Sequence, residues 1–163
     1  MTNQGKRLQS YEPMSFQEKN VAVSLANFIL IFGFTLIRVI QMIRTGNFTS
    51  TNVFRLWGII IVVAIIVTIF ATILTHIVAS IIQAIKTQEE PVIEDIQDER
   101  DQLIDLKGTK ITYVASSIGV LLSMLTFVFD QPPLVMFTLL IFSGVVAQII
   151  GDISRLILYR RGF

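Results

Sequence analysis

Four long runs of apolar residues divide the chain, and each is long enough to cross a lipid bilayer as a helix. They cover residues 20–43, 53–85, 111–129 and 133–159. A helix rises about 1.5 Å per residue, so about 20 residues span the hydrocarbon core. Because lipid offers the backbone no hydrogen-bond partner, even the β-branched stretch at 58–70 must be helical. The pattern predicts an all-α fold, an integral membrane four-helix bundle in a single domain.

Short polar stretches separate these runs. Residues 1–18 are polar, and the apolar run that follows begins too late for an ordinary signal peptide, so we expect an uncleaved tail. Residues 45–52 combine glycine, asparagine and hydroxyl side chains, which is typical of a tight connection, and residues 130–133 form a short turn with two prolines. The run at 53–85 exceeds what the hydrocarbon needs, so we expect it to tilt or protrude.

The composition agrees with membrane insertion and excludes several kinds of function. Hydrophobic residues make up 53% of the chain and charged residues 15%, with a mean hydropathy of +0.69. Four spans within 163 residues leave no room for a separate catalytic domain. The chain has no cysteine and one histidine, which excludes disulfides, iron–sulfur clusters and multi-histidine metal sites. We therefore expect no metal and no cofactor, and a net charge of +1 indicates no direct nucleic-acid partner.

Lysine and arginine are distributed unequally between the two sides of the expected bundle. Three arginines, Arg38, Arg44 and Arg55, fall on the side of the 45–52 connection, whereas ten basic residues fall on the opposite side. Basic residues are enriched in cytoplasmic segments, so both termini and the middle segment are expected in the cytoplasm. The ten residues are Lys6, Arg7, Lys19, Lys86, Arg100, Lys107, Lys110, Arg155, Arg160 and Arg161.

The middle segment, residues 86–110, is strongly acidic, with eight acidic and four basic residues. Read as a helix from Pro91 to Lys107, it carries most of its acid uncompensated on one stripe, with apolar residues in another sector. We expect a cytoplasmic acidic helical hairpin that packs on the protruding end of the second run. Three interpretations stay open: a solvated helix that continues the third span inward, a face that docks a partner, and a cation site. The stripe consists of Glu94, Asp98, Asp101 and Asp105.

This segment also carries a resemblance to a known family. The run Asp98-Glu99-Arg100-Asp101, then Leu103-Ile104, and Lys107 before a membrane helix, resembles an uncharacterised family of small four-helix bacterial membrane proteins. Members are often encoded beside a small helix-turn-helix transcription regulator. The resemblance covers roughly residues 94–160. It implies the bacterial cytoplasmic membrane and a regulatory partner, and it supplies no activity and no catalytic residues.

Polar residues within the apolar runs are costly in lipid and are therefore candidate functional groups. Counted from the charged ends, several fall at one depth, about 12 to 15 Å from the cytoplasmic anchors. One interpretation is a proton or cation relay through His76 and Asp152. The other is structural: Asp152 pairs with Arg155 three residues on, and His76 bonds to a serine or asparagine across the bundle. The proposed layer consists of Asn27, His76, Gln148 and Asp152.

Small residues recur at spacings of three and four in the last two runs. Such seams let helix backbones approach closely, so we expect these helices to pack on each other, with a homodimer as the competing use. The seams are Ser116, Gly119 and Ser123 in the third run, and Gly144, Ala147 and Gly151 in the fourth.

No glycine-rich phosphate loop or catalytic triad appears in the chain, so we expect no enzyme. The function that the sequence favours is an interaction or regulatory module that recruits a basic cytoplasmic protein, such as a transcription regulator, through the acidic hairpin. The alternative is a small oligomeric transporter or channel that uses the polar layer.

Overall fold

Four long helices make up the described part of the chain. The computed structural model describes residues 16–87 and 99–161. The fold is all-α, as predicted, and all four helices contain stretches long and apolar enough to cross a membrane. In chain order the helices are α1 (Phe16–Arg44), α2 (Ser50–Thr87), α3 (Glu99–Val128) and α4 (Pro133–Arg161).

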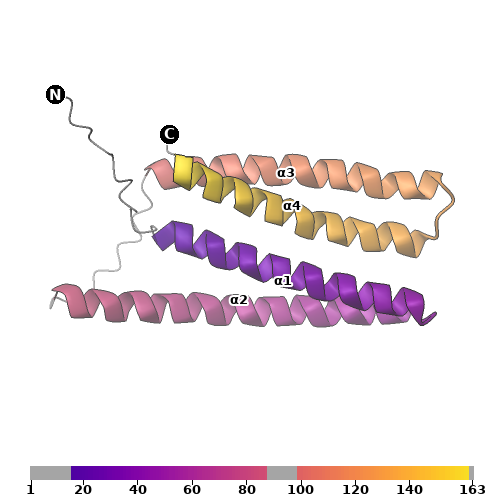
Figure 1. Cartoon of the computed structure of the whole chain (residues 1–163), viewed down its shortest axis with the longest axis horizontal. Coiled ribbons are helices and arrows are strands. Elements are labelled where there is room, and N and C mark those ends of the chain that lie inside the picture. Colours follow the sequence, from indigo (N-terminus) through magenta and orange to yellow (C-terminus); the bar gives the residue numbers. More distant parts are fainter. Residues whose placement is uncertain (1–15, 88–98, 162–163) are drawn as a thin grey trace, which may run out of the picture.

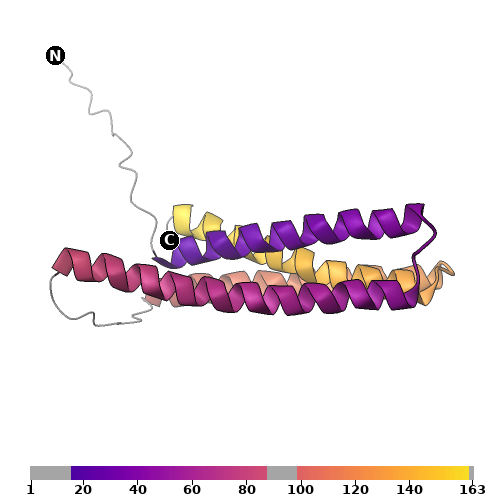
Figure 2. The same cartoon turned by 90° about the horizontal axis from the view of Figure 1, so that it is seen from below.

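The helices lie lengthwise beside one another in the order α3, α4, α1, α2 (Figure 1). Figure 2 shows the same molecule turned by 90°, with the start of α1, the end of α2, the start of α3 and the end of α4 again at one end. We call this the terminal end. The opposite end carries the two short connections, α1 to α2 and α3 to α4, and we call it the turn end.

Both connections at the turn end begin with the same hydrogen-bonded helix stop. Gly46, with φ of 69°, donates to the Ile43 carbonyl over 3.3 Å, and Asn47 donates to the Met42 carbonyl over 2.9 Å. This is a Schellman cap, which needs a left-handed residue. After α3 the left-handed position is filled by Asp130, with φ of 53°. An aspartate tolerates this conformation better than most residues.

The α2 helix is attached to the others near the turn end. Its first turns supply Val53, Leu56, Trp57 and Ile60 to a buried apolar cluster that also contains Val39 of α1. From residue 61 to residue 81, by contrast, its described large apolar side chains are all exposed. The closely packed part of the fold is therefore α3, α4 and α1, with α2 joined along one end.

The observed helices extend beyond most of the expected runs, and the largest difference is at α3. It begins at Glu99, so residues 99–110, which were expected within a hairpin, are the first turns of the third helix. Of the open interpretations of the acidic segment, continuation of the third span accounts for these residues. The rest of the expected hairpin, including Pro91, Glu94 and Asp98, lies outside the described residues.

Candidate functional site

A fork of hydrogen bonds from Arg155 of α4 joins α3 to α4 near the terminal end. Its Nε donates to Asp105 Oδ1, its Nη1 to Asp152 Oδ1 and its Nη2 to Thr109 Oγ1, each over 2.9 Å. The Arg155 side chain is only 11% exposed and that of Asp152 only 3%, whereas that of Asp105 is 64% exposed. The guanidinium thus binds one buried and one exposed carboxylate at once.

The Asp152 carboxylate is also bonded from α1, which brings a third helix into the cluster. Ser24 Oγ donates to Asp152 Oδ2 over 2.8 Å, and Gln148 Nε2 donates to Oδ1 over 3.2 Å. A buried charge is tolerated when it is paired and its remaining lone pairs accept hydrogen bonds. Together with Arg155, these contacts meet that requirement. We call Ser24, Asp105, Gln148, Asp152 and Arg155 the Asp152 cluster.

Two glycines allow the cluster to form at this close approach of α3 and α4. A Cβ at Gly108 would meet the Cγ of Arg155, so only glycine leaves room for the arginine to lie across α3. A Cβ at Gly151 would meet Thr112 Oγ1, and Gly108 O lies 3.4 Å from the same position. The absence of side chains here lets the two backbones approach while Arg155 reaches Asp105.

The rest of the expected small-residue seam lies between the same helices, with one exception. Ala147 and Ser123 are buried, and a Cβ at Gly119 would meet Ser143. Ser116 is partly buried on the same helix as Gly119. Gly144 is different, because a Cβ there would meet nothing within 4 Å. Its spacing suggested a place in the seam, yet Gly144 is exposed in the structure.

The acidic stripe of the sequence is divided by the structure. Asp105 is paired with Arg155, a contact between α3 and α4 that the sequence pattern did not predict. Asp101 accepts a hydrogen bond from the Tyr159 side chain, and Arg100 Nη2 donates to the Tyr159 carbonyl over 3.2 Å. The first turns of α3 are thus held to the end of α4 at several points.

The expected polar layer is also only partly assembled. Gln148 and Asp152 lie together, with Asp152 paired to Arg155 as the spacing of three predicts. Asn27 is partly buried on α1, one turn after Ser24. His76 belongs to α2, but its side chain lies outside the described residues, so its relation to Asp152 stays a prediction.

Sequence reasoning missed Ser24, Thr109 and the role of Arg155 as a bridge to α3. A signal for Ser24 exists, since it lies one helical turn before Asn27, which had been placed at the depth of Asp152. A signal for the bridge is weaker: Asp105 and Arg155 are 50 residues apart, and only the register of α3 against α4 brings them together.

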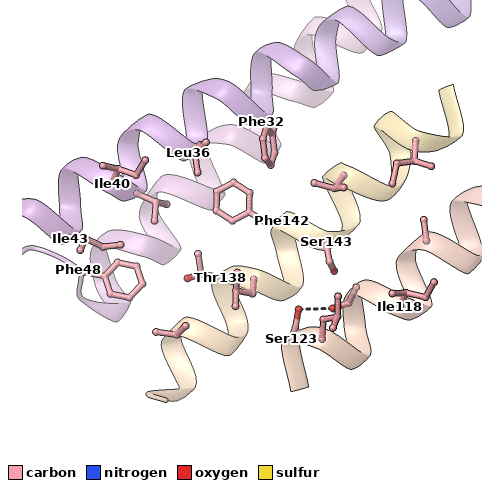
Figure 3. A pocket seen from close by; sticks show the side chains of 18 residues that line it. Phe32, Leu36, Ile40, Ile43, Phe48, Ile118, Ser123, Thr138, Phe142 and Ser143 are labelled. Carbon is pink, nitrogen blue, oxygen red and sulfur yellow. Dashed lines mark hydrogen bonds between the residues drawn. The ribbon is translucent and has the colours of Figure 1, made fainter. Parts of the chain in front are cut away.

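An apolar groove with a volume of about 900 Å³ lies over α4 between α1 and α3 (Figure 3). In Figure 3, Phe32, Leu36 and Ile40 of α1 form one wall, and Ile118 and Ser123 of α3 form the opposite side. The groove runs from Ile43 and Phe48 at the turn end toward Ile150, and it ends before the Asp152 cluster.

Within residues 16–87 and 99–161, no group of three or more histidine, aspartate or glutamate side chains is placed to hold a metal ion. The geometry therefore offers two features: a paired polar cluster near the terminal end and an apolar groove toward the turn end. No family model, no curated protein and no solved structure matches the chain.

Proposed function

We propose that the protein is a multi-pass integral membrane protein that acts without catalysis, as an interaction module. In this proposal its terminal end faces the cytoplasm of a bacterial cell. There the acidic segment at residues 86–110 captures a basic soluble protein, such as a transcription regulator. The observation that carries the proposal is the anchoring of the first turns of α3 to α4 by the Arg155 fork.

Anchoring matters because a rigid platform lowers the cost of binding. Every segment that becomes ordered on binding loses conformational entropy, so a charged surface that is already held in place binds more tightly. Here Arg155 and Arg100 of the chain fix residues 99–109 against α4. The platform leaves Glu99 exposed and leads directly to the acids that precede it in the sequence.

Charge supports a basic partner rather than a lipid surface at this end. The segment has an excess of four negative charges, which anionic lipid repels and a basic protein attracts. Asp101 and Asp105 already have contacts within the chain. Capture is therefore assigned mainly to the acids before Asp101, including Glu94 and Asp98.

Capture is tested with the full-length protein as bait in mild detergent, against soluble extract at two salt concentrations. The double variant Glu94→Gln with Asp98→Asn removes two negative charges and should lower recovery of a stoichiometric partner about tenfold at low salt. The difference should shrink at high salt, because salt screens exposed charge pairs. The matched control is Asp130→Asn, which removes an exposed acid at the turn end and should leave recovery unchanged. Equal recovery by all three proteins, or no stoichiometric partner in any growth condition, would reject the recruitment proposal.

The orientation has a separate test, which the absence of native cysteine makes clean. Thr49→Cys at the turn end should react with a membrane-impermeant thiol reagent in intact cells, whereas Glu99→Cys at the terminal end should react only after the cells are opened. Both positions are exposed on the protein, so protection reports the membrane side. The reverse labelling pattern would place the acidic segment outside and exclude a cytoplasmic partner.

The alternative of a transporter that uses His76 and Asp152 has less support from the geometry. The Asp152 carboxylate is already bonded to Ser24, Gln148 and Arg155, and the large groove is apolar. A permeation path for a polar solute needs polar groups that exchange partners along it.

A further inference from the structure

We propose that the apolar groove between α1 and α3 is a binding site for one anionic phospholipid, with an acyl chain in the groove and the phosphate at Arg44. This inference rests on the membrane insertion proposed above. It does not depend on which side of the membrane the turn end faces, because both leaflets contain acyl chains and phosphate.

The side chains that line the groove offer a polar occupant no free hydrogen-bond donor. Its three hydroxyl side chains each donate to a carbonyl of their own helix: Ser123 to Gly119 over 2.8 Å, and Thr138 and Ser143 to carbonyls one turn earlier over 2.7 Å. Since a hydroxyl has a single proton to donate, none of the three has one left for a ligand. The remaining lining is hydrocarbon apart from glycine, which favours an acyl chain.

The length of the groove can accommodate an acyl chain. Between Val135 and Ile150 the groove follows α4 for about 22 Å at 1.5 Å per residue, which is more than the roughly 15 Å of hydrocarbon that one leaflet contributes. A whole acyl chain can therefore lie along the groove.

Charge at the mouth of the groove selects the headgroup. Arg44 is exposed, ends α1, and follows Ile43 and Ile40 of the groove wall by one and four residues. It therefore lies above that wall at the turn end, where a lipid phosphate would lie. Guanidinium binds phosphate through paired hydrogen bonds. Among the described residues the turn end holds one acid, Asp130, so an anionic phosphate beside Arg44 meets little opposing charge.

The protein carries its own reporter for the occupant. Trp57 is the only tryptophan in the chain and is 4% exposed. Its ring packs edge-on against Phe142, with centroids 5.6 Å apart, and Phe142 lines the groove. A heavy-atom quencher on an acyl chain in the groove therefore lies one ring away from the indole.

The test titrates brominated phosphatidylglycerol into the full-length protein in mild detergent and follows Trp57 fluorescence. We expect saturable quenching that reaches its limit at about one lipid per chain. Arg44→Gln should weaken the apparent affinity about fivefold, the effect of one basic residue at a lipid surface. Arg55→Gln, with the same charge change on α2, should not.

A second pair of variants tests the groove itself. Leu139→Phe with Val146→Phe narrows the groove from its α4 side and should weaken binding about tenfold, because insertion of a chain then overpacks it. Leu140→Phe changes an equally exposed leucine that is not in the lining, 38% against 40%, and should bind as the parent does.

Quenching that never saturates, or that is equal in all variants, would overturn the proposal. So would groove variants that turn an oligomer into monomers without any change in lipid binding, since a second copy would then occupy the groove. The titration contains no protein partner and reports only on Trp57, so its failure leaves the capture experiment on the acidic segment unaffected.

Discussion

Replacing Arg155 by leucine should lower the free energy of unfolding by about 3 to 5 kcal/mol, the largest effect expected from a single change in this protein. The reason is the burial of Asp152, whose side chain is 3% exposed and would lose the guanidinium that pairs with it. Ser24 and Gln148 would still donate to it, but neutral donors do not balance a buried charge. Unfolding in mixed micelles, followed by the loss of helical circular dichroism, measures the change.

Two further variants make the explanation specific. Asp152→Asn should cost less, about 1 to 2 kcal/mol, because Arg155 keeps Asp105 and Thr109 as partners. The double variant Arg155→Leu with Asp152→Leu should be more stable than Arg155→Leu alone, since it removes the unpaired charge together with its partner. A double variant no more stable than Arg155→Leu, or an Arg155→Leu protein as stable as the parent, would contradict the pairing account.

The four helices could be predicted from the sequence, with bounds within a few residues except at the start of α3, because mean hydropathy is a property of long stretches. A run such as 53–85 needs no knowledge of its neighbours to be read as a span. For the same reason the sequence does not predict which part of α2 packs against the other helices. Its apolar residues look alike along the helix, whereas the structure buries Val53, Trp57 and Ile60 and exposes the described large apolar side chains from residue 61 to residue 81.

The polar cluster could be predicted only where its contacts are local. The pairing of Asp152 with Arg155 follows from a spacing of three on one helix. The pairing of Arg155 with Asp105 does not, because closer basic residues, Arg100 and Lys107, were available in the sequence. Arg155 reaches Asp105 because Gly108 and Gly151 set how close α3 and α4 approach, which is a property of two helices together.

Gly144 and Gly151 are equivalent in the sequence pattern but differ in the structure, so substitutions at these two glycines separate helix packing from helix propensity. Gly151→Ala should destabilise the protein by about 1 to 3 kcal/mol, because the new methyl group meets Thr112 Oγ1 and forces α3 away from α4. Gly144→Ala meets nothing within 4 Å and should be neutral or stabilising by up to about 1 kcal/mol, through the better helix propensity of alanine.

A substitution at Thr112 on α3 can relieve the clash in the Gly151→Ala variant, which tests the cause of the clash. Adding Thr112→Ala to Gly151→Ala removes the oxygen that the new methyl group meets and should recover most of the lost stability in the same micelle unfolding assay. Thr112→Ala alone should have a small effect, because its hydroxyl donates only to the Gly108 carbonyl of its own helix. If Gly144→Ala and Gly151→Ala proved equally harmful, or if Thr112→Ala gave no relief, helix propensity or a contact elsewhere would control stability. The close approach of α3 and α4 at Gly151 would then not be what sets the register in which Arg155 reaches Asp105.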